Sequence, residues 1–139
     1  MLDGFNHVAI LTADLDRLEG FYRDMFGVED VRHMDHNGLQ HRLMRVGAAS
    51  VLHAFEVGDA PRPAAIFERG RIDHLALNVT DRDEFDRLSS RLVAAGASDG
   101  TRTDFGVLVS VSFTDPDGHF CELCWMRPTA SLADARDPS

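Results

Sequence analysis

Two histidines lie at matching places in two similar stretches of the sequence. His7 is the second residue of Asn-His-Val-Ala-Ile (residues 6–10), and His74 is the second residue of Asp-His-Leu-Ala-Leu (residues 73–77). Glu122 follows later, in a run of mostly apolar residues. Two neutral imidazoles and a carboxylate are donors that first-row divalent ions bind, and three protein ligands leave coordination positions for water and substrate. We therefore predict a catalytic metal site held by these three residues.

An ordinary structural role is the alternative for each of them. A lone histidine is more often a satisfied core residue than a ligand, and a strand carboxylate is often solvated. The repeat favours the metal site, because two unrelated core histidines have no reason to share one register. An unpaired charge at Glu122 would also be costly among apolar neighbours.

The repeat extends beyond the histidines. Asp14 and Asp16 follow the first run at the same spacing as Asp81 and Asp83 follow the second. Such self-similarity indicates two copies of one structural unit. Each copy is predicted to form a short strand, an amphipathic helix and three further strands.

Both helices have recognisable ends. Asp14 and Asp81 are the predicted N-caps, Glu84 completes a capping-box pattern, and Gly27 and Gly96 lie just past the C-terminal ends. Apolar residues at helical spacing follow each cap. They are Leu15, Leu18, Phe21, Tyr22 and Met25 in the first copy, and Phe85, Leu88 and Leu92 in the second.

The remaining strands are separated by turn residues. Asn37-Gly38 is a strong hairpin signal, and Asp-Pro-Asp-Gly at 115–118 is a second turn. The predicted strands cover residues 30–36, 40–46 and 50–57 in the first copy, and 101–104, 107–114 and 120–126 in the second.

These elements predict one α+β domain made of two βαβββ modules. A sheet covered by a helix on one face needs a partner for its other face, and the second copy supplies it. Module one covers residues 4–57, and module two covers 72–126. Residues 58–71 form the linker, with a turn near 64–67, and the polar tail 127–139 is expected to be loosely held.

Strand alternation places the chemical groups on one side of these sheets. His7 shares a face with Ala9, whereas Val8 and Ile10 point toward the helix. The same parity puts His74 on the concave face of the second module. Phe120, Glu122 and Cys124 share a face of the last strand, so Cys121 points the other way. The two cysteines are therefore predicted to form neither a redox pair nor a zinc site.

The motifs together resemble the vicinal oxygen chelate superfamily of glyoxalases, bleomycin resistance proteins and extradiol dioxygenases. The resemblance covers roughly residues 4–126 and is carried by residues 5–10, 21–27, 72–77 and 113–123. It implies a glyoxalase-like curved mixed sheet around a central cavity. It also implies that His7, His74 and Glu122 bind a divalent ion, one of Zn, Ni, Fe, Mn or Co.

A fourth position in that family lies on the last strand of the first module, where glyoxalases usually carry glutamate or glutamine. Counting from Gly47 favours His53, as a fourth metal ligand or a base. Glu56 is the alternative, but it would require a three-residue shift that reverses the strand's faces. Without a carboxylate there, the usual glyoxalase proton shuttle is in doubt.

Weaker expectations concern other side chains. His41 could line the cavity, and His119 is expected to be exposed because its parity is opposite to that of Glu122. Four aromatic residues could form an apolar wall, although core packing is the commoner role. They are Phe55, Phe105, Phe120 and Trp125.

Composition indicates which classes of binding partner and which cellular location to expect. A net charge of −9 argues against nucleic acid and anionic lipid, which require concentrated basic residues. The 44% apolar fraction is that of a soluble globular protein, and no export signal or membrane span is apparent. A cytoplasmic protein with a small-molecule substrate is expected, and the resemblance adds a homodimer.

The leading functional hypothesis is a metal-dependent, glyoxalase-like lyase or isomerase acting on a molecule with vicinal oxygens. An extradiol-type dioxygenase is the first alternative, since two histidines and a carboxylate also form the facial triad of non-haem iron oxygenases. A metal-free, drug-binding protein like those of bleomycin resistance is the second. Thiol transfer to an antibiotic such as fosfomycin is a third, although no distinctive basic cluster for a phosphonate is evident.

Overall fold

The chain consists of two compact units, Met1–Pro63 and Ala64–Ser139. The computed structural model describes residues 5–59 and 63–136. The first unit contains β1 (His7–Thr12), α1 (Leu15–Phe26), β2 (Val31–His36), β3 (Leu39–Arg45) and β4 (Val51–Glu56). The second contains β5 (Leu75–Val79), α2 (Arg82–Ala94), β6 (Arg102–Asp104), β7 (Leu108–Thr114), β8 (Phe120–Met126) and the 3-10 helix η1 (Leu132–Asp134).

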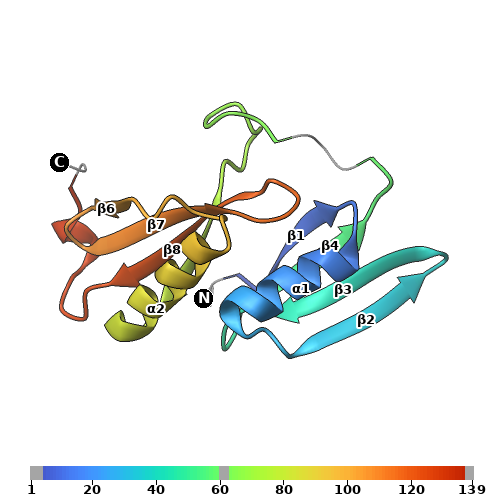
Figure 1. Cartoon of the computed structure of the whole chain (residues 1–139), viewed down its shortest axis with the longest axis horizontal. Coiled ribbons are helices and arrows are strands. Elements are labelled where there is room, and N and C mark those ends of the chain that lie inside the picture. Colours follow the sequence, from blue (N-terminus) through green and yellow to red (C-terminus); the bar gives the residue numbers. More distant parts are fainter. Residues whose placement is uncertain (1–4, 60–62, 137–139) are drawn as a thin grey trace. The chain divides into compact units, whose positions relative to one another are not determined.

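Each unit is a four-stranded mixed sheet with one helix on one face (Figure 1). The strand order is β1-β4-β3-β2 in the first unit and β5-β8-β7-β6 in the second. In both, the first and last strands pair in parallel and the others pair antiparallel. The predicted α+β class and the two βαβββ modules are confirmed, and each module forms its own sheet.

The two helices begin and end where the sequence indicates. Asp14 Oδ1 accepts a hydrogen bond from the backbone N–H of Arg17, and Asp81 Oδ1 accepts one from that of Glu84. Gly27 is left-handed with φ of 71°, a conformation that glycine adopts without steric cost. The Glu84 carboxylate, which is predicted to complete a capping box, accepts hydrogen bonds from the Arg87 side chain on the helix surface.

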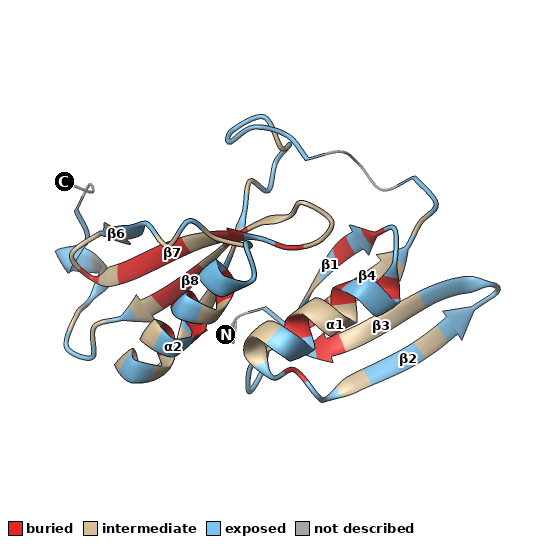
Figure 2. Cartoon of the chain, viewed as in Figure 1, coloured by how far each residue is buried: buried red, intermediate tan, exposed pale blue. Residues whose placement is uncertain are grey.

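The core lies between each helix and the sheet beneath it. Figure 2 shows buried stretches on both helices and along β7. Leu18 and Tyr22 of α1 and Phe85 and Leu92 of α2 are almost fully buried. The sheet contributes the alternate residues of its central strands to the same layers, among them Leu52 and Ala54 of β4, Val111 and Phe113 of β7, and Leu123 of β8.

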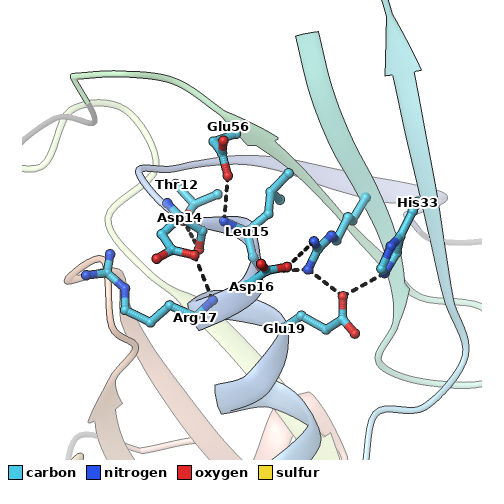
Figure 3. Close-up of polar contacts among 9 residues, drawn as sticks. Thr12, Asp14, Leu15, Asp16, Arg17, Glu19, His33 and Glu56 are labelled. Atoms are coloured by element: carbon cyan, nitrogen blue, oxygen red, sulfur yellow. Dashed lines mark hydrogen bonds and ion pairs between the residues drawn. The ribbon is translucent and has the colours of Figure 1, made fainter. Parts of the chain in front are cut away.

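An ion-pair network fastens α1 to the β2–β3 hairpin on this helix-covered side (Figure 3). The Arg42 guanidinium donates to the carboxylates of Asp16 and Glu19 and, at 2.8 Å, to the carbonyl of Leu15. His33 Nε2 lies 2.8 Å from Glu19 Oε2. The guanidinium also holds the pKa of Asp16 below its usual value. The network is structural, because it lies on the face opposite His7.

The linker and the tail both contain ordered contacts. A turn closes where Glu68 N–H donates to Ala65 at 3.0 Å, close to the turn expected near residues 64–67. After η1, the backbone N–H of Arg136 donates to the Phe105 carbonyl at 3.1 Å, so the tail is held up to this point rather than loose. Neither described helix is long and apolar enough to cross a membrane.

Candidate metal centre

One group of predicted site residues lies in the first unit, on the sheet face away from α1. His7 opens β1 and is exposed, as are Ala9 and Leu11. Ile10 and Thr12 alternate with them and are buried beneath the helix. The predicted parity of this strand is therefore confirmed, and His7 is accessible to a ligand.

The second group lies on the equivalent face of the second unit. His74 directly precedes β5 and is exposed, and Ala76 and Asn78 continue its face. Glu122 pairs with Ala76 across the parallel β5–β8 ladder, so it shares this face. Cys121 and Leu123 of β8 point to the opposite, buried side.

Strand register identifies His53 as the counterpart of Glu122. Ala9 pairs with His53 in the first unit, and Ala76 pairs with Glu122 in the second. Each alanine lies two residues after its module's histidine. Partners in register point to the same side of a sheet, so His7 and His53 share a face just as His74 and Glu122 do.

Glu56 is engaged elsewhere. It pairs with Thr12 at the end of β1, and its Oε2 accepts a hydrogen bond of 2.9 Å from the backbone N–H of Leu15 (Figure 3). This bond satisfies one of the free N–H groups at the start of α1. Of the two residues considered for the fourth position, the geometry favours His53.

Each of the two predicted histidine ligands has its Nδ1 bonded to the residue before it. His7 Nδ1 lies 2.9 Å from Asn6 Oδ1, and His74 Nδ1 lies 2.9 Å from Asp73 Oδ1. Amide and carboxylate oxygens only accept, so Nδ1 carries the proton in both rings. In the neutral ring, Nε2 then presents a lone pair. Histidines that bind metals almost always donate their other ring N–H to such a group, so the two imidazoles fit a divalent ion.

Asn6 and Asp73 were not singled out from the sequence. The signal was present, because both belong to the repeated runs and immediately precede the repeated histidines. Their side chains point to the function of those histidines only when the hydrogen bonds are known.

His53 lies in an aromatic and histidine-rich neighbourhood. Its Nε2 lies 2.8 Å from His41 Nδ1, and its ring centroid is 5.6 Å from that of His7 and 4.1 Å from that of Phe55. Burial, and secondly the charges of His41 and His7, lower the pKa of His53 below its usual value. His53 is therefore a neutral imidazole on the same face as His7, which suits a ligand or a base.

Glu122 has a thiol beside it. Cys124 Sγ lies 3.8 Å from Glu122 Oε2, and burial together with this carboxylate raises the pKa of Cys124 to about 12. Cys121 and Cys124 are both free and buried. They face opposite sides of β8, as the strand parity predicts.

His119 differs from its expected exposure. Its Nδ1 lies 2.8 Å from Asp115 Oδ2, and its side chain is 30% exposed. Asp115 Oδ1 also accepts from the N–H groups of Asp117 and His119, and its side chain is fully buried. The carboxylate that organises the turn draws His119 inward, an effect that strand parity alone does not include.

The predicted ligand set draws on both units, with His7 and His53 in one and His74 and Glu122 in the other. Within the described ranges, no group of three or more His, Cys, Asp or Glu side chains is close enough to hold an ion. The four-residue set and the central cavity remain predictions. The structure establishes the faces, registers and hydrogen bonds within each unit.

Comparison with known proteins identifies the family. The model of the Glyoxalase/Bleomycin resistance protein/Dioxygenase superfamily matches residues 4–123. The chain belongs to this superfamily. The match includes His7, His74 and Glu122, and it confirms the family that the sequence motifs resemble.

Several known proteins are similar to this chain at low sequence identity. Metallothiol transferase FosB from Lysinibacillus sphaericus is 28% identical over 98% of this chain and 89% of its own length. A glyoxylase/bleomycin resistance protein/dioxygenase domain from Frankia sp. EAN1pec has a TM-score of 0.74 and 21% identity, covering 94% of this chain and 96% of its own. The fosfomycin resistance protein FosX from Listeria monocytogenes, in complex with Mn(II) and sulfate, has a TM-score of 0.65 and 20% identity, covering 96% and 98%.

Proposed function

We propose that this protein is a divalent-metal-dependent enzyme that acts on a small molecule with two adjacent oxygens, by lyase or isomerase chemistry. The observation that carries the proposal is the matched pair of hydrogen bonds at Nδ1 of His7 and His74. The two bonds recur at repeat-related histidines, and a metal ligand gains a fixed tautomer and orientation from such a partner.

His7, His74 and Glu122 would hold the ion in this proposal. When bound, the ion supplies positive charge that stabilises an oxyanion or enolate on the substrate. His53 is suited to hold or remove a substrate proton, because it is a neutral imidazole on the same face as His7. His41 can relay that proton, since its ring lies within hydrogen-bond distance of His53.

Thiol transfer to a phosphonate is a second candidate, favoured by the similarity to the FosB protein along 98% of the chain. An anionic substrate of this kind needs a cation. Arg32 pairs with Leu43, which pairs with His53, so the exposed arginine lies on the same sheet face as His53. A single arginine is a weaker feature than the histidine pair, so this candidate comes second.

Metal analysis of the purified protein tests the metal proposal. We expect one divalent ion per chain in the wild type and loss of that ion in His74→Ala and Glu122→Gln, with the fold retained by circular dichroism. The matched control is His36→Ala, because His36 is an exposed histidine at the end of β2, a strand that is not a neighbour of β1 in the sheet. A wild type without stoichiometric metal would instead support the metal-free, drug-binding alternative.

Assays of the metal-loaded protein then separate the reactions. A glutathione hemithioacetal tests the lyase or isomerase, fosfomycin with a thiol tests the transferase, and a catechol with oxygen tests the dioxygenase. We expect turnover of the first. Turnover of either of the others alone would replace the proposed reaction while leaving the metal site intact.

A further inference from the structure

The Asp73 carboxylate has three partners at the end of the linker. Its Oδ1 lies 2.9 Å from His74 Nδ1, and its Oδ2 accepts a hydrogen bond of 2.6 Å from the backbone N–H of Phe67. The Arg69 guanidinium lies 3.2 and 3.3 Å from the two oxygens. Three groups thus fix the position of this carboxylate, and two of them belong to the linker.

Arg69 also reaches the other neighbour of His74. Its guanidinium lies 4.4 Å from the centroid of the Phe120 ring, in the geometry of a cation–π contact. Phe120 in turn packs edge-on against the His74 ring, with centroids 6.1 Å apart. A ring of contacts within the second unit therefore connects Arg69, Asp73, His74 and Phe120, each touching the next.

Phe67 gives the linker turn an unusual backbone. Its φ of 66° is left-handed, which costs a residue with a side chain free energy, and its ring is 84% exposed. Burial of the ring therefore cannot explain the conformation. The bond from its N–H to Asp73 is the contact that supports it.

The first module achieves the corresponding bond with a neutral residue. Asn6 binds His7 through an amide, which requires no counter-ion, whereas the carboxylate of Asp73 is charged and is paired with Arg69. A charged orienting group held by a guanidinium and a backbone N–H has less freedom to rotate than an unsupported one. The linker thus restricts the orientation of the Asp73 carboxylate and, through it, that of the His74 ring.

We infer that Arg69 and the backbone N–H of Phe67 are positioning groups for His74, acting through Asp73, so that the linker turn is a working part of the second half of the metal site. The role in metal binding rests on the proposed function, but the effect on the His74 ring does not. Asp73 held in place fixes the proton on Nδ1 and keeps the Nε2 lone pair directed away from the linker. By linkage, an ion on His74 in turn stabilises the turn.

The ring tautomer of metal-free protein tests the positioning directly. Long-range proton–nitrogen NMR spectra at alkaline pH report which nitrogen of His74 is protonated. We expect the proton on Nδ1 in the wild type and in Asp73→Asn, which keeps an acceptor like that of Asn6. We expect a mixture of tautomers in Asp73→Ala and a partial shift in Arg69→Gln.

Arg127→Gln is the matched control. Arg127 pairs with Asp104 at 2.8 and 3.1 Å and lies 5.9 Å from the Trp125 ring centroid, so it resembles Arg69 in chemistry but does not contact His74. Its replacement should leave the His74 spectrum unchanged. An unchanged spectrum in Arg69→Gln would overturn the role of the linker, and an unchanged spectrum in Asp73→Ala would overturn the role of Asp73. If Asp73→Ala fails to fold, Arg69→Gln decides.

Metal affinity distinguishes this inference from the proposed function. Loss of an outer partner of a histidine ligand typically weakens metal binding by roughly 10- to 100-fold. We expect a loss in this range for Asp73→Ala, a loss on the order of 10-fold for Arg69→Gln, and wild-type affinity for Arg127→Gln. If the wild type binds Mn²⁺ and Zn²⁺ and His74→Ala does not, but Arg69→Gln matches the wild type, the proposed function stands and the role of the linker is wrong. If the wild type itself binds no metal, the proposed function fails and the NMR result alone decides the role of the linker.

Discussion

His53 and Glu56 lie three residues apart on β4 and therefore point to opposite faces of the sheet. One shares its face with His7, and the other bonds the start of α1. Counting from Gly47 favours His53, and the strand register favours the same residue. The two agree because the residues of β4 pair in regular register with both neighbouring strands. The role of His53 in the site stays a prediction.

Alanine variants of these two residues should show which one acts in the functional site and which one only stabilises the fold. His53→Ala is expected to reduce turnover or metal affinity at least about 10-fold, on the scale of losing a proton-transfer group or an outer partner. Glu56→Ala is expected to leave both unchanged but to lower the free energy of unfolding by about 1 kcal/mol, because the Leu15 N–H loses its acceptor. Chelator competition and urea unfolding measure the two effects. The reverse pattern would assign the fourth position to Glu56.

His119 gives a pH-dependent contribution to stability. Its hydrogen bond to Asp115 raises the pKa of His119 above its usual value of 6.5. A raised folded-state pKa means that the stabilisation is complete below the pKa of the unfolded chain and is lost as pH rises through the folded-state pKa. The difference in free energy of unfolding between wild type and His119→Gln should therefore be largest near about pH 5.5 and shrink by about pH 9.

Urea unfolding at those two pH values measures the effect, which we expect to be on the order of 1 kcal/mol. His36→Gln, in the exposed β2–β3 hairpin, is the control and should differ from wild type by less than about 0.5 kcal/mol at both. A wild-type advantage that grows with pH would show that the hydrogen bond does not favour the charged imidazole.

At the scale of single elements, the two helices start in the same way. Asp14 and Asp81 each accept one backbone hydrogen bond of 2.9 Å in the first turn. Replacing either by alanine should lower the free energy of unfolding by about 1 kcal/mol, the usual value of an N-cap. Asp24→Ala at the exposed end of α1 should change it by less than about 0.5 kcal/mol. Equal effects of all three variants in thermal and urea unfolding would contradict a capping role.

The elements could be predicted closely because their signals are local. Alternation, helical spacing, caps and the Asn37-Gly38 turn act within a few residues, and the observed strands begin and end within a residue or two of their predicted limits. The face of Glu122 followed from the same alternation. These signals also sufficed to identify two copies of one module.

Contacts across segments without periodicity could not be predicted. Phe67 and Arg69 bond to Asp73 from a linker whose sequence contains no regular pattern. The hydrogen bond from the Arg136 N–H to the Phe105 carbonyl joins segments far apart in the chain. Such bonds depend on three-dimensional proximity, so only the paired residues Asn6 and Asp73 left a trace in the sequence. The bond between Asp115 and His119 is local, but strand parity does not include it because it arises from the turn.

At the scale of the whole molecule, the proposed metal should stabilise both units. An ion that binds only the native chain adds about 2.7 kcal/mol at a concentration 100 times its Kd. Because the predicted ligands come from both units, chelation should lower the thermal stability of each. The single Tyr22 reports on the first unit and the single Trp125 on the second.

Thermal unfolding with added metal or chelator, followed by Trp125 fluorescence and Tyr22 NMR signals, measures this coupling. We expect both signals to shift upward by several degrees with metal in the wild type, and neither to shift in His74→Ala. A shift of the Trp125 signal alone would mean that His7 takes no part in binding. Sizing of the same samples would also test the expected homodimer.

The pairing of Ala9 with His53 and of Ala76 with Glu122 shows that the two units carry different residues at equivalent positions. One half presents a ring that can gain a proton, and the other presents an anion. In the proposed site, a substrate bound by both residues would have one preferred orientation, because inverting it would exchange its partners. The two copies would then select between mirror-image substrates through a difference at one position.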